Sequence, residues 1–103
     1  MALELWQTEW CPASRRVRER LTELGVDYLI RQVPVEQADR EQLQEVVGCR
    51  TIPALCLADG RPVVGEQAIR SYLDEHFPEP PEADAHKAKA AKALKRLLEE
   101  RCA

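Results

Sequence analysis

The first third of the sequence constrains the fold most, because strand, helix and strand patterns follow one another with very short connections. Apolar and polar residues alternate over residues 3–7, which predicts a strand. Over residues 12–24, Val17 and Leu21 recur at helical spacing among charged residues, which predicts an amphipathic helix. Alternation returns over residues 26–33. Two strands joined by one helix predict parallel pairing through a right-handed crossover.

A second and a third helix are predicted further along the chain. Asp39 and Gln42 have the spacing of a capping box ahead of an apolar stretch, and Gly48 follows as a stop. Apolar residues at helical spacing over residues 68–77 predict the third helix.

Between these two helices, a pair of short apolar runs predicts an antiparallel hairpin. The runs cover residues 54–58 and 61–64, and Asp59-Gly60 joins them. This dipeptide supplies the positive φ angles of a tight turn. The whole pattern predicts an α/β fold of the order βαβ-ββα, with a four-stranded mixed sheet, over residues 1–77.

Beyond this domain, we expect a proline-rich connector at residues 78–82 and a further helix over residues 83–103 that packs on the same domain. The net charge of -3 at pH 7 argues against a nucleic-acid partner, and no apolar run is long enough to cross a membrane. The first residues lack a basic region followed by an apolar core, so we expect a cytoplasmic protein with reduced thiols. We also expect a monomer.

Cys11 is the leading candidate for chemistry because it lies where the first strand passes into the first helix. Unpaired N–H groups and the helix dipole stabilise a thiolate at such a position. Arg15 and Arg16 follow within one turn and add positive potential, and Trp10 is placed to shield one side of the sulfur. The alternative is an inert, buried cysteine. The following Pro12 favours the reactive interpretation.

Two short motifs resemble those of glutaredoxins. Residues 10–14, Trp-Cys-Pro-Ala-Ser, resemble the active-site segment, and residues 51–53, Thr-Ile-Pro, resemble the cis-proline loop. The order of the elements agrees over most of the chain. The resemblance implies a thioredoxin-like fold in which Pro53 is cis and faces Cys11. It also implies that the backbone of Ile52 pairs with the cysteinyl part of bound glutathione.

The resemblance implies further glutathione contacts near the third helix. In the family, a basic residue near the cis-proline loop and the start of that helix hold the glutathione carboxylates, which points here to Arg50. Residues 65–69, Gly-Glu-Gln-Ala-Ile, are similar to the Glu-Ser-x-Ala-Ile segment of glutathione transferase N-terminal domains. We expect Glu66, which replaces the serine, to repel the glutathione α-carboxylate. The implied glutathione-binding residues are Trp10, Arg50, Ile52, Pro53, Gly65, Glu66 and Gln67.

The active-site segment contains one cysteine. Ser14 stands where dithiol glutaredoxins have a resolving cysteine, so its hydroxyl can only donate a hydrogen bond to the thiolate, which favours a monothiol route. Cys49, close to the cis-proline loop, is a second candidate for a resolving thiol. Cys56 is expected in the core. The histidines and cysteines lack ligand spacing, so we expect no metal site.

The resulting hypothesis is an enzyme, a glutathione-linked thiol–disulfide oxidoreductase in which Cys11 is the nucleophile. Glutathione is the expected co-substrate, and the expected partners are glutathionylated or disulfide-containing proteins. Two other interpretations stay open. One is an iron–sulfur cluster held by Cys11 and glutathione, although the Cys-Gly-Phe-Ser segment of such glutaredoxins is absent. The other is a redox-inactive adaptor that keeps the fold for protein contacts.

Overall fold

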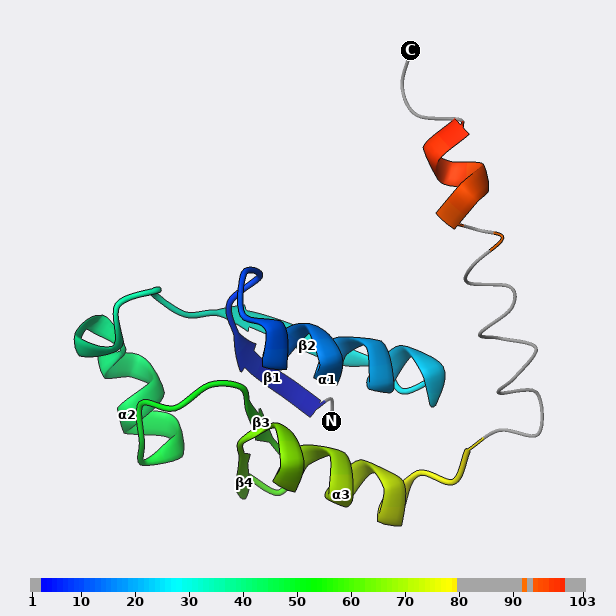
Figure 1. Cartoon of the computed structure of the whole chain (residues 1–103). Coiled ribbons are helices and arrows are strands. Elements are labelled where there is room, and N and C mark those ends of the chain that lie inside the picture. The colour runs from blue at the N-terminus through cyan, green and yellow to red at the C-terminus, as the bar shows by residue number, and fades with distance from the viewer. Residues whose placement is uncertain (1–2, 80–91, 93, 100–103) are drawn as a thin grey trace.

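The computed structural model describes residues 3–79, 92 and 94–99 of the chain (Figure 1). Four strands form one sheet in the order β2-β1-β3-β4, in which β1 and β2 are parallel and the other pairs are antiparallel. This confirms the predicted βαβ-ββα order and the mixed sheet. The elements are β1 (Leu3–Gln7), α1 (Pro12–Glu23), β2 (Tyr28–Gln32), the 3-10 helix η1 (Gln37–Asp39), α2 (Glu41–Val47), β3 (Ala54–Cys56), β4 (Pro62–Val64) and α3 (Glu66–His76).

The sheet lies between two layers of helix, and the alternation along β1 shows why. Leu5 is fully buried on the side of α1 and α3, where it packs with Leu21 and Ile69. Trp6, the next residue, is buried on the opposite side against Leu43 of α2. Because β1 is covered on both faces, the chain segment that leads to Cys11 is one of the most firmly held parts of the domain.

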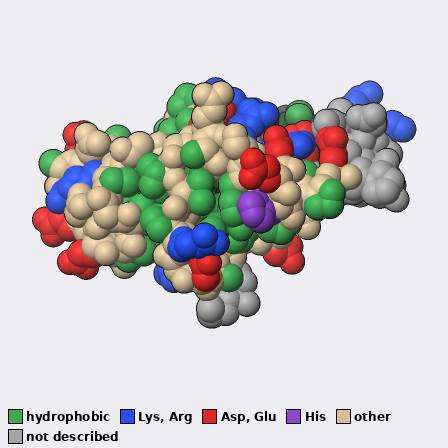
Figure 2. All heavy atoms as spheres, turned by 90° about the horizontal axis from the view of Figure 1, so that it is seen from below, with side chains coloured by type: hydrophobic (Ala, Val, Ile, Leu, Met, Phe, Trp, Pro, Cys, Tyr) green, Lys and Arg blue, Asp and Glu red, His purple; other side chains and the backbone are tan. Residues whose placement is uncertain are grey.

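On the face formed by α2, β4 and α3, acidic and basic side chains lie next to one another around a band of apolar groups (Figure 2). This interleaving resembles an ordinary solvated surface more than the single-sign surface that attracts a phosphate backbone.

The capping box predicted for the second helix is wrong. Asp39 belongs to η1, and Arg40 is the residue that precedes α2. The Arg40 N–H donates to the Gln37 carbonyl at 3.2 Å, which keeps Asp39 inside a 3-10 turn. A capping side chain needs extended backbone at its own position, and Asp39 lacks it. The stop at Gly48 is confirmed, with φ of 88°.

The hairpin between β3 and β4 is confirmed, but its turn is built differently from the predicted one. Gly60 has φ of 90°, whereas Asp59 keeps a negative φ. Asp59 contributes through its side chain instead, because its Oδ1 accepts the Arg61 N–H at 3.0 Å. The Gly60 N–H donates to the Leu57 carbonyl at 2.9 Å, so the turn takes up more residues and the paired strands are shorter than predicted.

Most of the predicted C-terminal helix lies outside the described residues. Residues 92 and 94–99 are helical, and Leu94, Leu97 and Leu98 are each about 60% exposed. The connector at residues 78–82 and the packing of this helix on the domain stay predictions. Among the described residues, no helix has the length and apolar character needed to span a membrane.

Candidate active site

Cys11 occupies the N-cap position of α1, as the sequence predicts. Its N–H donates to the Thr8 carbonyl at 3.1 Å, which closes the turn that leaves β1. Its Sγ accepts the Ser14 N–H at 3.4 Å, so the sulfur takes the place that a capping oxygen has in other helices. Pro12 follows at the first helical position, where its missing N–H costs no hydrogen bond.

The surroundings of the sulfur favour the thiolate. Partial burial opposes ionisation, but the Ser14 hydroxyl, the N–H groups of Ser14 and Ala13, and the Arg40 guanidinium together lower the pKa of Cys11 below its usual value. The thiol is half-buried, so a reactant still reaches it. A low pKa together with access is the combination found in reactive cysteines.

Ser14 has a second feature that links it to the sulfur. Its side chain is fully buried, and among the described residues its Oγ has no hydrogen-bond partner of ordinary geometry. The hydroxyl proton is therefore available to the one acceptor that appears on ionisation, the Cys11 thiolate. The role predicted for Ser14, a hydrogen bond from its hydroxyl to the thiolate, stays a prediction.

The arginines that follow Cys11 in the sequence are engaged with acidic partners. Arg15 pairs with Glu19 along the exposed face of α1 at 2.9 Å. Arg16 binds Glu66 of α3 through two hydrogen bonds, of 2.7 and 2.8 Å. The Glu66 carboxylate, and more weakly the charge of Cys11, raise the pKa of Arg16. The positive potential predicted from Arg15 and Arg16 is therefore largely offset by their partners.

Arg40, which sequence reasoning missed, supplies a charge that lowers the pKa of the thiol. Its guanidinium donates to the carbonyls of Pro34, Val35 and Arg50 at 2.8 to 2.9 Å. These three acceptors are neutral, so the positive charge is held in place without being cancelled by a carboxylate. The same contacts join the segment after β2 to the segment that leads into the Thr51 loop.

The Thr51 loop is tied to the start of α3. The peptide bond between Ile52 and Pro53 is cis, and the Pro53 carbonyl accepts the Gly65 N–H at 2.9 Å. Gly65 has φ of 94°, a conformation that residues with a Cβ rarely adopt, and it directly precedes the first turn of α3. The loop and the helix N-terminus are thus fixed relative to one another.

Known proteins share sequence and fold with this chain. The family model described as "Glutathione S-transferase, N-terminal domain" matches residues 5–81. The chain belongs to this family. No protein of curated function matches it.

Solved structures share the fold of this glutathione S-transferase N-terminal domain. A glutathione S-transferase from Rhodospirillum rubrum is 33% identical with a TM-score of 0.65, over 76% of this chain and 35% of that one. Rice GST1, solved with glutathione, is 29% identical with a TM-score of 0.67, over 94% and 45%. Glutaredoxin 2 from Salmonella typhimurium, also solved with glutathione, is 19% identical with a TM-score of 0.66, over 77% and 35%, and this likeness concerns the fold alone. The chain therefore spans less than half the length of each of these proteins, and its thioredoxin-like fold is confirmed.

The other residues predicted to contact glutathione differ in their exposure and in their hydrogen bonds. Trp10 is 81% exposed, so the indole packs little against the rest of the domain and the predicted shielding of the sulfur is not seen. The Arg50 guanidinium donates to the carbonyls of Gln37 and Ala38, at 3.3 and 2.6 Å. Ile52 is half-buried on the core beside α2. Gln67, Gly65 and Glu66 meet at the N-terminus of α3, where Gln67 is exposed.

Glu66, at the N-terminus of α3, forms ion pairs with two arginines. It pairs with Arg16, and its Oε2 also lies 3.6 Å from the Arg70 Nη1. The hydrogen bond from Arg16 is the main reason that the pKa of Glu66 is lowered. An ion pair therefore links the N-terminal half of α1 to the start of α3, close to the predicted glutathione site.

The other described cysteines are free and lie beside α2. Cys49 and Cys56 are both half-buried against the same core cluster, which agrees with the packing role predicted for Cys56. Burial, then Glu4 and Asp59, raise the pKa of the Cys56 thiol. The resolving role of Cys49 stays a prediction. Within the described part of the chain, no three His, Cys, Asp or Glu side chains come together as a metal site.

Proposed function

We propose that this domain is a glutathione-linked thiol–disulfide oxidoreductase that uses Cys11 in a monothiol mechanism. The observation that carries the proposal is the Cys11 sulfur at the N-terminus of α1, which accepts the Ser14 N–H and has a lowered pKa. The same helical turn holds a serine in place of a second cysteine. A thiolate of this kind is a nucleophile and also a good leaving group.

The reaction proceeds in two exchanges. The Cys11 thiolate attacks the glutathione sulfur of a glutathionylated protein, a new disulfide forms between Cys11 and glutathione, and the protein thiolate leaves and takes up a proton. The thiolate of a second glutathione then attacks the glutathione sulfur attached to Cys11. This step releases glutathione disulfide and restores the Cys11 thiolate. Each cycle therefore consumes one free glutathione, and the other half of the glutathione disulfide comes from the glutathionylated protein.

The Thr51 loop and the start of α3 suit the first product, which is the disulfide between Cys11 and glutathione. Because the Pro53 carbonyl is fixed to the Gly65 N–H, the backbone of Ile52 is presented at a constant place relative to α3. We assign glutathione to this place, with its peptide alongside Ile52 and a carboxylate at the start of α3. Rice GST1 and the Salmonella glutaredoxin 2, which share the fold, were solved with glutathione. Reduced glutathione is abundant where thiols stay reduced, which supports a cytoplasmic location.

The test is turnover of a glutathionylated peptide, with glutathione and glutathione reductase as the coupling system. Four proteins are compared: the wild type, Cys11→Ser, Cys49→Ser and Cys56→Ser. We expect activity in all except Cys11→Ser. Cys56→Ser is the matched control, because this thiol is half-buried like Cys11 but has a raised pKa.

Other outcomes would point to different functions. Loss of activity in Cys49→Ser as well as Cys11→Ser would assign a resolving role to Cys49. If the wild type turns over no faster than the uncatalysed reaction, the enzyme proposal is wrong. Labelling of the Cys11 thiol at the rate of a free thiol would then favour the adaptor, and colour after anaerobic purification with iron would favour the cluster.

A further inference from the structure

One edge of the sheet is formed by β2, which within the described part of the chain pairs only with β1. Four of its five residues are exposed, and they include two large apolar side chains, Leu29 at 53% and Ile30 at 42%. An exposed apolar edge offers unpaired backbone groups and apolar contacts together, which makes it a template for another strand.

The direction of the free backbone groups can be read from one hydrogen bond. The Val33 N–H donates to the Gln7 carbonyl at 2.9 Å, so the backbone of Val33 faces β1. Backbone groups alternate sides along a strand, and therefore Leu29 and Arg31 also face β1. Tyr28 and Ile30 turn their N–H and C=O groups outward, away from the sheet.

We propose that two copies of this chain associate edge to edge through β2, antiparallel and centred on Leu29. In this register Tyr28 of one copy and Ile30 of the second copy exchange backbone hydrogen bonds, and the reverse pair does the same. Leu29 lies opposite Leu29. Asp27 lies opposite Arg31 of the second copy, and this ion pair occurs twice because the arrangement is two-fold symmetric.

Charge complementarity selects this register. A pairing centred on Ile30 would place Arg31 opposite Leu29 and Asp27 opposite Val33, which gives neither charge a partner of opposite sign across the two strands. Asp27 is exposed just before β2. The Arg31 guanidinium is held over the ring of Trp6, at 5.9 Å from its centroid, and its Nε lies 3.3 Å from Glu4 Oε2. It remains half-exposed, so a second carboxylate can approach it.

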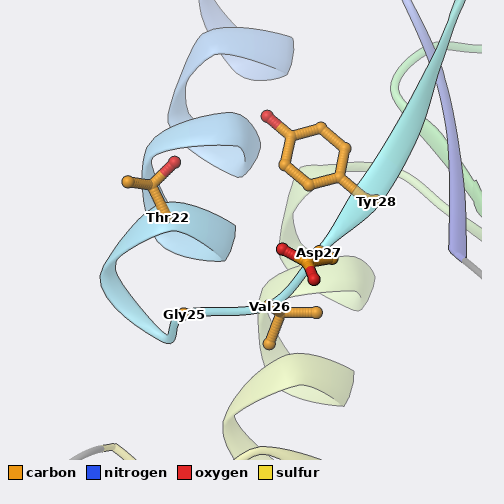
Figure 3. Close-up of a pocket in the computed structure, with 5 residues that line it drawn as sticks. All are labelled: Thr22, Gly25, Val26, Asp27 and Tyr28. Carbon is orange, nitrogen blue, oxygen red and sulfur yellow. The ribbon is translucent and has the colours of Figure 1, made fainter.

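The surface next to the edge has space for the added strand. Tyr28 and Asp27 line an open pocket of about 510 Å³ between the end of α1 and the start of β2 (Figure 3). Tyr28 points from β2 toward α1, and Ile30 of the second copy would lie beside it on the same face. The two Cys11 residues, each at the far end of its own β1, would lie at opposite ends of the joined sheet, so both stay open to reactants.

The test measures self-association by sedimentation velocity over a range of protein concentrations. We expect a concentration-dependent dimer for the wild type, loss of the dimer in Asp27→Arg and in Arg31→Asp, and its recovery in the double variant that exchanges the two charges. Glu75→Arg, the same charge change on the exposed surface of α3, is the matched control and should dimerise like the wild type. Far-ultraviolet circular dichroism checks that each variant is folded.

Three outcomes would overturn the proposal. A wild type that stays monomeric up to about 1 mM, the weak limit of specific association, leaves the monomer expected from the sequence. A dimer that persists in Asp27→Arg, which removes no contact within the domain core, uses another surface. Failure of the exchanged double variant to dimerise, when folded, excludes this register.

Discussion

Replacing Ser14 by alanine separates two effects that the structure assigns to its buried hydroxyl. A hydrogen bond to a charged group contributes about 1.5 to 3 kcal/mol, and two backbone N–H donors, from Ser14 and Ala13, remain after the change. Taking the lower end, the thiolate fraction of Cys11 at a pH below its pKa should fall about tenfold. The intrinsic nucleophilicity of a thiolate rises with its basicity with a slope of about 0.5, so each remaining thiolate should react about threefold faster.

The net expectation for Ser14→Ala is a crossover. Below the pKa of Cys11, exchange with a small uncharged disulfide should be about threefold slower than in the wild type, and at a pH where both proteins are ionised it should be about threefold faster. The probe is a small uncharged disulfide of an aromatic thiol. The assay measures the rate at which this thiol is released, from neutral to alkaline pH. Ser71→Ala, at an exposed position of α3, is the control and should follow the wild-type curve.

The free energy of unfolding should also depend on pH, because the same thiol ionises. The pKa of Cys11 is lower in the folded state than in the unfolded one, so between the two values the unfolded chain binds more protons and stability rises with pH. This contribution is complete above the unfolded pKa and is lost as the pH falls through the folded pKa. Ser14→Ala should gain less from alkaline pH, and near neutrality it should lose little, because it removes a buried hydroxyl without a partner. Superimposable rate and stability profiles for Ser14→Ala and wild type would refute the role of the hydroxyl.

Three other substitutions test the charges and the core. Arg40→Met should raise the pKa of Cys11, because it removes a cation that lowers it, and the disulfide probe should react more slowly below that pKa; Arg61→Met, in the hairpin, is the control and should leave the profile unchanged. The pairing of Glu66 with Arg16 lowers the pKa of this carboxyl, so its contribution to stability is lost as the pH falls through the folded pKa, below 4.5. Glu66→Gln lacks this contribution, and in urea unfolding it should therefore lose less stability in acid than the wild type does. An equal acid dependence in both proteins would contradict this pairing. Val17→Ala should cost about 2 kcal/mol of unfolding free energy, whereas Val46→Ala, with the same change at a half-exposed helical position, should cost much less; equal losses would contradict the assigned core.

The parts of the fold that were predicted correctly have local signals. The alternation over β1 and the apolar spacing in α1 each reflect one buried face, and Pro12 and Gly25 mark the two ends of that helix. Cys11 was placed at the N-terminus of α1 on the same evidence. Such signals depend only on neighbouring residues, so they are readable without knowing what packs where.

The parts that were missed depend on the tertiary structure. Asp39 has capping-box spacing, but the 3-10 turn competes for the same backbone and wins, so the spacing misled. Arg40 carries no motif at all. Its role appears only because the segments that hold Pro34 and Arg50 come together and present their carbonyls to one guanidinium. A lone basic residue of this kind is indistinguishable from solvated surface in the sequence.

The charge at the start of α3 shows how such contacts change a functional expectation. From the sequence alone, Glu66 places a negative charge where a glutathione carboxylate is expected. In the structure two cations, Arg16 and Arg70, lie against this one carboxylate, so the group as a whole is positive. The N-terminal dipole of α3 has the same sign. We therefore expect an incoming carboxylate to be attracted when it approaches from the side of the arginines, which the glutamate holds in place.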